Sequence, residues 1–374
     1  MENYFIIGGG ILGASTAYHL TRSGCKVTLF DAGHKGRAAD AAAGIIAPWV
    51  SQRRNKKWYA IARGGAIYYP ELIDMLRDSG QEGAGYQKVG SLHLHDIDER
   101  LDHKHRHLLK RQETAHEMGK ITLLNHAETR AYFPEAHERF QSVHVEGSAR
   151  VNGAELREAL LQAAVNEGLH LVHDHAALHL QNGRPAVTVG PETFYPDKLI
   201  ITAGAWTRPL LEQAGFESRS SVQKGQIIHL KKRDENKHYP VVIPHGEYYL
   251  IHFGGGNMAF GASKEEITDY NTEVSAGSQA ELLQALLHVA PSLENAEITG
   301  VRTGLRPFTP GFLPVFGPLK GGSDIIVADG LGASGLTSGP YLGRELANLA
   351  TGQPMELDPA DYPLEKAAAD TILD

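Results

Sequence analysis

The chain has 374 residues, of which 42% are hydrophobic and 21% are charged, so it is long enough for two domains and has the composition of a soluble globular protein. Its formal net charge of −8 gives no general electrostatic basis for nucleic-acid binding, and we expect no such partner. The single cysteine, Cys25, excludes an intrachain disulfide and is typical of a reducing cytoplasm, where we expect the protein to reside. No uninterrupted apolar run reaches the roughly 18 residues of a membrane span, although peripheral membrane contact stays open.

The opening stretch, residues 4–31, predicts a strand, a tight turn, a helix and a second strand. Gly8, Gly10 and Gly13 form the pattern G-x-G-x-x-G directly after the first apolar run. In such a turn the first glycine permits the sharp bend, the second lets a pyrophosphate approach the backbone, and the third lets the helix pack against the sheet. Asp31 ends the second strand, near the spacing expected for an acid that binds a ribose hydroxyl. A plain glycine-rich turn would not explain that acid, so we predict a bound adenine dinucleotide.

The next segment, residues 33–48, is rich in alanine and glycine and contains Arg37. It fits either a flexible connection or backbone that runs beneath a flat cofactor ring. Apolar residues at helical spacing then predict a long amphipathic helix within residues 51–78. Its nearby arginines and lysines are interpreted as a solvated face, with attraction of an anionic substrate as the alternative.

The central part of the chain predicts strands and helices in turn. Alternation predicts a strand over 89–95, followed by a polar, histidine-rich helix over 99–118. His103 and His107 share a helical face there, but no second pair of ligands follows, so we expect no metal site. An apolar stripe predicts a helix over 152–168, and a strand begins at 169.

The following strands divide into two kinds. A buried strand over 197–202 ends in small residues before a helix, which fits a second approach to a nucleotide or a plain turn. Short strands separated by turn residues predict an antiparallel sheet, followed by a helix over 276–289 and a strand over 298–307; these short strands are 222–230, 241–243, 248–252 and 258–261. Arg302 and Arg306 are four apart in the last strand and therefore share one face.

The chain ends as it begins, with a strand over 324–328, a glycine-rich loop over 329–339 and a helix over 342–350. Both ends are therefore expected to join one α/β nucleotide domain. The predicted fold is α/β, with a Rossmann-like dinucleotide-binding domain (FAD-binding by the family resemblance given below) and a second domain of mainly antiparallel sheet plus helices. The first domain is assigned to 1–85, 142–220 and 310–374, and the second, substrate-binding domain to 86–141 and 221–309.

The sequence resembles the flavin-dependent D-amino-acid oxidase family, which includes glycine oxidase, sarcosine oxidase and D-amino-acid dehydrogenases. The resemblance covers nearly the whole chain and rests on IIGGGILG with Asp31, AAAGIIAP, KGQ at 224–226, GLRP at 304–307 and DGLGASGLT near the end. It implies FAD as the cofactor, held noncovalently because Cys25 is far from the position of the family's covalent attachment. The implied cofactor-binding residues are Gly8, Gly10, Ile11, Leu12, Gly13, Asp31, Ala32, Arg37, Ala43, Gly44, Ile45, Val172, Ala203, Gly204, Trp206, Gly332, Ala333, Ser334, Gly335, Leu336 and Thr337.

The resemblance also implies the residues that bind the substrate carboxylate. The family's substrate arginine falls at Arg306, whose planar guanidinium matches a carboxylate bidentately. The family's tyrosine falls at Tyr249, with Tyr248 facing the other side of a regular strand. The chain departs from glycine oxidase at Ala333, where an arginine is usual, and at His252-Phe253, where Pro-Arg is more typical.

The expected reaction is oxidation of the C–N bond of a small amino acid or N-substituted amino acid, with hydride transfer to flavin N5. The acceptor of the electrons is oxygen, or a quinone or carrier in a dehydrogenase. A noncatalytic flavin-binding component of a larger complex also stays open, and a plain NAD dehydrogenase is a weaker alternative. The sequence leaves open which amino acid is used and whether the protein forms a homo-oligomer.

Overall fold

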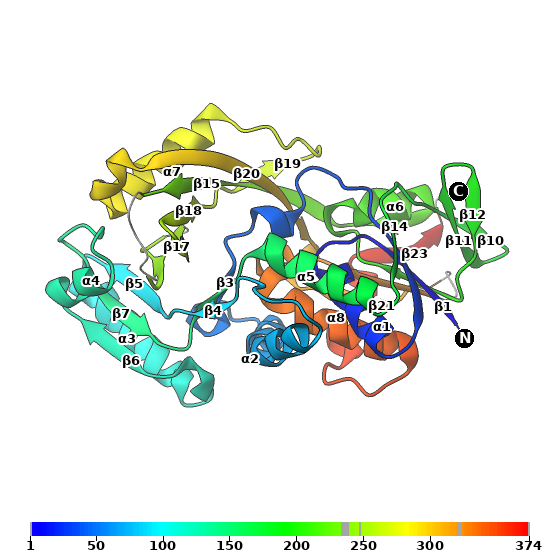
Figure 1. The fold of residues 1–374 in the computed structure, drawn as a ribbon, viewed down its shortest axis with the longest axis horizontal. Helices are drawn as coiled ribbons and strands as arrows, with labels where there is room; N and C mark the ends of the chain where they lie inside the picture. The colour runs from blue at the N-terminus through cyan, green and yellow to red at the C-terminus, as the bar shows by residue number, and fades with distance from the viewer. Residues whose placement is uncertain (1, 233–238, 247, 321–323, 373–374) are drawn as a thin grey trace.

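The computed structural model describes residues 2–232, 239–246, 248–320 and 324–372, and its larger part is built on two sheets (Figure 1). The first sheet has the strand order β21-β22-β13-β1-β2-β9 and is parallel except for β21. Its strands are β1 (Asn3–Ile7), β2 (Lys26–Phe30), β9 (His170–Val172), β13 (Lys198–Ile201), β21 (Val315–Pro318) and β22 (Ile325–Asp329). The first and last α/β units of the chain therefore lie in one sheet, as the sequence predicts.

Different elements cover the two faces of this sheet. Successive residues of a strand point to opposite faces, so neighbouring residues contact different elements. On one face Ile6 and Ile200 pack with helices α1 (Ile11–Arg22), α5 (Gly153–Asn166) and α8 (Gly335–Thr351). On the other face Ile7 and Ile201 pack with an antiparallel three-stranded sheet. That sheet consists of β10 (Ala177–Gln181), β11 (Arg184–Val189) and β12 (Glu192–Phe194).

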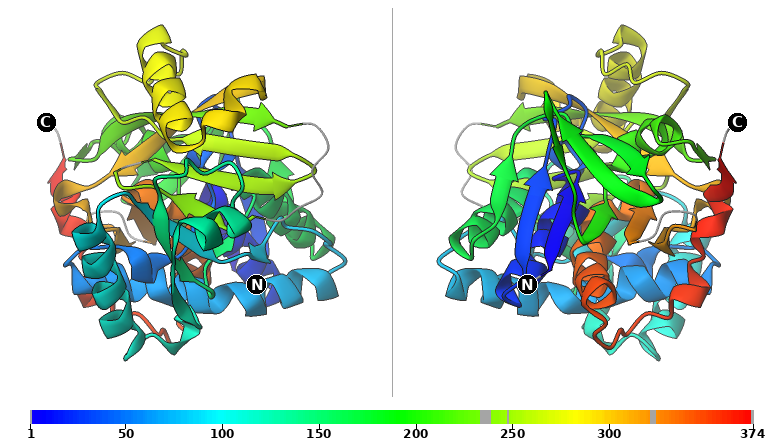
Figure 2. Two further views of the ribbon diagram at one scale, coloured as in Figure 1. Left: turned by 90° about the vertical axis from the view of Figure 1, so that its left-hand side faces the viewer. Right: turned by 90° about the vertical axis from the view of Figure 1, so that its right-hand side faces the viewer.

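Helices α1 and α8 lie side by side and hold the start and the end of the chain together. The Ser15 hydroxyl of α1 donates a hydrogen bond to the Pro340 carbonyl of α8 at 2.7 Å. A Cβ added to Gly343 would come within 2.5 Å of the Ser15 side chain, so the two helices approach closely. Helix α2 (Lys56–Asp78) also packs on α8 and runs along the lower edge of the molecule (Figure 2).

The second sheet joins two separate parts of the chain. Its order is β19-β15-β18-β17-β16-β5-β7-β6, with β20 paired to β15, and the parallel pair β16–β5 links the two parts. The strands are β5 (Ser91–His95), β6 (Ile121–Leu124), β7 (Gln141–Val145), β15 (Ser221–Lys231), β16 (Val241–Ile243), β17 (Tyr249–Gly254), β18 (Asn257–Gly261), β19 (Glu265–Ile267) and β20 (Glu297–Phe308). The long strands β15 and β20 reach from this sheet toward the first one (Figure 1).

The second sheet is covered by α3 (Asp98–Gln112), α4 (His126–Tyr132) and α7 (Ala276–Val289). The remaining elements are short: α6 (Thr207–Gln213) follows β13, β3 (Ile45–Ile46) and β4 (Gln87–Lys88) both pair with β8 (Ala149–Arg150), and β14 (Phe216–Ser218) pairs with β23 (Ala368–Ile372). Within the described ranges no helix is both long and apolar enough to cross a membrane.

Several element boundaries differ from those that the sequence predicts. Helix α8 begins at Gly335, inside the predicted loop, because residues 336–343 are buried and packing overrides the low helix propensity of glycine and proline. Helix α2 begins at Lys56, where the Asn55 side chain caps it. Helix α3 ends at Gln112 rather than 118. The proposed domain boundary after residue 141 passes through β7, a strand of the second sheet, and the division itself stays a prediction.

Candidate functional site

A cavity of about 760 Å³ lies at the carboxyl edge of the first sheet and faces the second sheet. The loops that follow β1, β2, β13 and β22 line one side of it. Residues of β15, β17 and β20 line the other side, including Gly225, Tyr249 and Arg306. Ligands of open α/β sheets bind at this edge, so the cavity is the candidate active site.

The amino ends of α1 and α8 both face this cavity. Neither helix has a side-chain cap or an acidic residue in its first turn, so the N–H groups of both ends stay available for an anion. An added Cβ at Gly10, the N-cap of α1, would meet no atom within 4 Å, so the backbone there borders open space. Gly8 has a φ of +106°, and a Cβ there would lie 2.6 Å from the Thr202 carbonyl oxygen. These features fit the diphosphate of a dinucleotide.

Asp31 is held by backbone and by a cation at the end of β2. Its carboxylate accepts hydrogen bonds from the backbone N–H groups of Gly9 and Gly33, each at 2.7 Å. The Arg37 guanidinium donates to it at 2.8 Å and also to Asp40. Burial alone would raise the pKa of Asp31, but Arg37 and the two N–H groups outweigh it and lower the pKa. The carboxylate is therefore ionised and fixed at the wall of the cavity.

Two stacked aromatic rings, those of His34 and Trp206, line the cavity near Asp31. The ring of His34 stacks on Trp206 with centroids 4.7 Å apart and planes 17° apart. Trp206 in turn stacks on Tyr270, which lies in the connection between β19 and α7. Burial, followed by the neighbouring His175, lowers the pKa of His34, so its neutral ring is favoured. The small residues at 203–205 thus do more than turn the chain, because Trp206 directly after them lies at the cavity wall.

The segment that follows residue 40 is fixed rather than a loose connection. Ile45 belongs to β3, and its carbonyl accepts a hydrogen bond from the Thr337 hydroxyl at 3.0 Å. A Cβ at Gly44 would lie 1.8 Å from the Val151 carbonyl oxygen, so the backbone passes very close to its neighbour. Residues 41–45 line the cavity, as do residues 332–337 at the start of α8, which supports the interpretation that backbone borders a flat cofactor.

Arg306 reaches the cavity from β20 and is positioned by β15. Its Nη1 donates to the Gln223 Oε1 atom at 3.0 Å and to the Ser263 carbonyl at 3.2 Å. The guanidinium lies over Gly225, where an added Cβ would come within 2.4 Å of Nη2. Tyr249 lines the same cavity from β17. Arg302 instead donates to the Asp40 carbonyl at 3.0 Å, is exposed, and does not line the cavity.

Tyr248 also lines the cavity, although a regular strand would turn it away from Tyr249. It lies just before β17, and its hydroxyl donates to Glu281 of α7 while its ring packs against Phe260. The alternation argument therefore does not apply at this position, because the strand has not yet begun.

Most residues that the sequence assigns to the site line the cavity, and two do not. Gly13 supports the turn instead, because a Cβ there would lie 1.9 Å from the Gly8 carbonyl oxygen. Val172 does not border the cavity but contacts a residue that does, because its carbonyl accepts a hydrogen bond from the Asp31 N–H at 2.9 Å. The residues that do line it are Gly8, Gly10, Ile11, Leu12, Asp31, Ala32, Arg37, Ala43, Gly44, Ile45, Ala203, Gly204, Trp206, Gly332, Ala333, Ser334, Gly335, Leu336, Thr337, Tyr249 and Arg306.

The sequence reasoning missed several lining residues. His34 and Asp329 stand beside motif residues and could have been found by extending the motifs, but Lys264 lies in a connection that carries no motif. Gly225 is the central residue of the KGQ segment, whose part in the site was not recognised from sequence. Asp329 accepts hydrogen bonds from the Ser220 hydroxyl and the Gly330 N–H, yet complete burial raises its pKa to about 6.

The fold, the two uncapped helix ends and the cavity between the sheets are those of a dinucleotide-binding protein. Residues 3–349 match the family model described as FAD dependent oxidoreductase (DAO). The chain is 44% identical over 365 residues to the uncharacterised oxidoreductase YurR of Bacillus subtilis, covering 97% of this chain and 98% of that one. It is 30% identical over 376 residues to a glycine oxidase of Pseudomonas aeruginosa, with 96% and 98% covered.

Among solved structures, iminodiacetate oxidase from Chelativorans sp. BNC1 superposes with a TM-score of 0.93 at 36% identity, covering 96% of this chain and 98% of that one. Glycine oxidase from Geobacillus kaustophilus shares the fold with a TM-score of 0.85 at 23% identity, with 97% and 99% covered. The chain therefore belongs to the DAO family of FAD-dependent oxidoreductases. It is an enzyme, and FAD is its cofactor.

Proposed function

We propose that this enzyme oxidises the C–N bond of a small amino acid or N-substituted amino acid, with Arg306 and Tyr249 binding the substrate carboxylate. The observation that supports this most is the placement of Arg306, which borders the same cavity as the two helix ends and is anchored from one side by β15. Two relatives are named glycine oxidase and iminodiacetate oxidase, and glycine and iminodiacetate are compounds of this kind.

The residues assigned to the cofactor fall into groups that suit different parts of it. The N–H groups at the start of α1 suit the diphosphate, and Asp31 suits the ribose hydroxyls. The amino end of α8, at Gly335, offers positive potential to charge that develops during the reaction. When bound, FAD supplies the acceptor for a hydride from the substrate carbon.

The substrate residues act by binding and orientation. Arg306 would present its guanidinium fork to the carboxylate, and the Tyr249 hydroxyl would donate a second hydrogen bond. The α-carbon then loses a hydride with both electrons, the amine nitrogen loses a proton to water, and a C=N bond forms. Water hydrolyses this imine to a carbonyl compound and ammonia, or to a smaller amine when the nitrogen carries a substituent. The two electrons leave with oxygen or with an electron carrier.

Anaerobic mixing tests this proposal directly. The purified holoenzyme is combined with glycine, sarcosine, proline, iminodiacetate and a set of D-amino acids while the visible flavin absorbance is followed. We expect at least one of them to bleach the flavin rapidly. Absence of bleaching by every member of the panel would contradict the proposal. A parallel hydrogen peroxide assay in air distinguishes an oxidase from a dehydrogenase that uses another acceptor.

A further inference from the structure

Gln223 lies at the centre of a row of three polar side chains that crosses three strands. In the sheet register it is opposite Arg306 of β20 on one side and opposite Glu266 of β19 on the other. Directly opposite residues of neighbouring strands place their side chains on the same face of a sheet. Gln223 Oε1 accepts a hydrogen bond from Arg306 Nη1 at 3.0 Å, and Gln223 Nε2 donates to Glu266 Oε1 at 2.7 Å. Glu266 therefore acts on Arg306 through Gln223.

These two neighbours fix the orientation of the Gln223 amide. A guanidinium offers only donors and a carboxylate offers acceptors, whereas an amide has an oxygen that accepts and a nitrogen that donates. The amide oxygen must therefore face Arg306, and the amide nitrogen must face Glu266. An amide turned the other way would bring donor against donor and acceptor against acceptor, so both hydrogen bonds would be lost.

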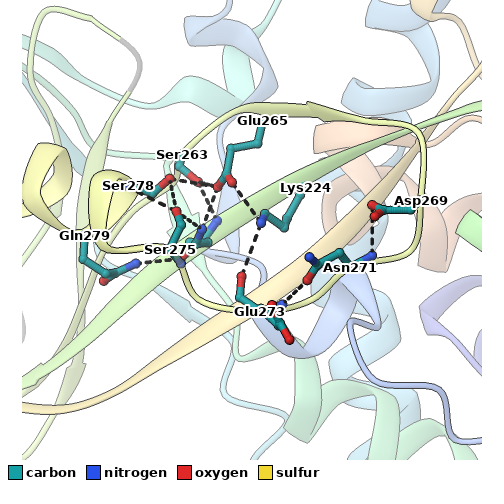
Figure 3. A network of polar contacts seen from close by, with 10 residues as sticks. Lys224, Ser263, Glu265, Asp269, Asn271, Glu273, Ser275, Ser278 and Gln279 are labelled. Atoms are coloured by element: carbon teal, nitrogen blue, oxygen red, sulfur yellow. Dashed lines mark hydrogen bonds and ion pairs between the residues drawn. The ribbon is translucent and has the colours of Figure 1, made fainter.

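The second acceptor of Arg306 Nη1 is the Ser263 carbonyl at 3.2 Å, and a separate polar network holds Ser263 in place (Figure 3). The Ser263 hydroxyl accepts a hydrogen bond from the Gln226 N–H and donates one to Glu265, each at 2.9 Å. Glu265 in turn pairs with the buried Nζ of Lys224 at 2.9 Å. The carbonyl that receives Arg306 Nη1 is therefore held by a buried ion pair.

Two carboxylates thus hold Arg306 indirectly. Glu265 and Glu266 are consecutive residues of β19 with side chains on opposite faces, and each reaches Arg306 through one uncharged acceptor. Among the described residues no carboxylate pairs with Arg306, and the hydrogen bonds that it donates to protein atoms all come from Nη1. Its Nη2 lies over Gly225, a residue of the cavity wall. The positive charge and the Nε–Nη2 edge of the guanidinium therefore remain for a ligand carboxylate.

We propose that Gln223 is a positioning residue that keeps Arg306 available for the substrate carboxylate. It binds Nη1 through an uncharged oxygen, which fixes the plane of the guanidinium without cancelling its charge. The substrate carboxylate then takes the Nε–Nη2 edge, while Glu266 maintains the orientation of the amide. This inference rests on the proposed function and assigns the edge of Arg306 that the substrate uses.

The test measures the binding of acetate to the holoenzyme by the change in visible flavin absorbance. Acetate is a carboxylate without an amine to be oxidised, and acetamide is the matched ligand without the charge. Gln223→Met removes the amide, and Gln223→Glu replaces it by a carboxylate of the same shape. Gln162→Glu is the control, because Gln162 is an exposed glutamine of α5 that does not line the cavity. Anaerobic flavin reduction by glycine, sarcosine and iminodiacetate is measured in the same proteins.

We expect acetate to bind and acetamide to leave the spectrum unchanged. Gln223→Met should weaken acetate binding about tenfold, because Arg306 Nη1 loses a charge-assisted hydrogen bond and the guanidinium is less well fixed. Gln223→Glu should weaken it further, because its negative charge pairs with Arg306 and opposes a second carboxylate. A role of Gln223 in shape alone would give the opposite order. The half-saturating concentration of an amino acid that reduces the flavin should rise in parallel, while the limiting rate changes less.

Glu266→Met tests the indirect route to Arg306. It should weaken acetate binding about two- to threefold, because the Gln223 amide keeps only one of its two partners. In the Gln223→Met background the same substitution should add nothing, because Glu266 acts through Gln223. Glu266 is exposed, so Glu266→Met should fold and tests the inference even where a Gln223 variant does not.

Three outcomes would overturn the inference. If Arg306→Leu abolishes acetate binding but no variant of Gln223 or Glu266 alters it, the inference is wrong while the proposed function stands. If Gln223→Glu binds acetate as tightly as the unchanged protein, an uncharged partner of Arg306 is not required. If Arg306→Leu leaves both acetate binding and flavin reduction unchanged, the proposed carboxylate site fails and this inference fails with it.

Discussion

The Gly10→Ala variant separates cofactor binding from folding. Gly10 has a φ of −69° and a ψ of −174°, which alanine adopts without strain, and an added Cβ would meet no protein atom within 4 Å. The unfolding free energy of the apoprotein should therefore stay the same or rise by about 0.4–1 kcal/mol. The methyl group would instead occupy the space assigned to the diphosphate. Overpacking of this kind costs about 1–3 kcal/mol, so FAD affinity should fall about 5- to 150-fold.

The assay is a titration of the apoprotein with FAD, together with chemical unfolding of the same preparation. Gly8→Ala is the control, because its Cβ would clash with the Thr202 carbonyl at a φ of +106° and should destabilise the fold itself. Unchanged FAD affinity in a folded Gly10→Ala protein would refute the placement of the diphosphate at α1. A lower free energy of unfolding in the Gly10→Ala variant would contradict the inference that the space next to Gly10 is open.

Further expectations concern other residues around the cavity. Asp31→Ala should weaken FAD binding about 10- to 150-fold in the same titration, because a charge-assisted contact is lost; equal affinity would mean that Asp31 only ends its strand. Gly225→Ala should displace the Arg306 guanidinium and raise the substrate concentration needed for flavin reduction while FAD stays bound, whereas an unchanged value would show that the guanidinium does not depend on this space. Burial raises the pKa of Asp329 to about 6, so its ionised form is disfavoured and the folded state loses stability as pH rises through about 4 to 6. Asp329→Asn should then stabilise the protein at pH 8 by up to about 3 kcal/mol and lose this advantage near pH 4, and a pH-independent difference in melting temperature would contradict that. Denaturation should release intact FAD, since Cys25 does not line the cavity, and flavin that stays with the precipitate would show a covalent link.

The parts of the fold that the sequence predicts well are those whose local pattern agrees with the final packing. The glycine motif and the alternating apolar runs predict β1, α1 and β2, and the amphipathic pattern predicts α7 with its observed bounds. The start of α8 was missed because Gly335, Gly339 and Pro340 are poor helix formers, and burial against α1 and α2 compensates for this only in the folded chain.

In the candidate site, too, residues within local motifs could be predicted from the sequence, whereas residues brought together only by folding could not. The residues next to the glycine motifs and Arg306 follow from sequence or from the family resemblance, because they stand in short recognisable segments. The stack of His34 on Trp206 joins residues far apart in the chain and has no local signal. The place of the Ser263 carbonyl beside Arg306 depends on a network that combines β15, the segment after β18 and the start of α7, so it could be assigned only from the structure.

The binding of the substrate carboxylate by Arg306 is the central claim, and anaerobic flavin reduction by Arg306→Leu tests it most directly. Arg302→Leu serves as the control, since Arg302 lies on the same strand outside the cavity. We expect Arg306→Leu to remain folded with FAD bound and to need about 30-fold to several thousand-fold more substrate, with partial recovery in Arg306→Lys. Normal reduction in Arg306→Leu together with its loss in Arg302→Leu would contradict the assignment of the carboxylate site.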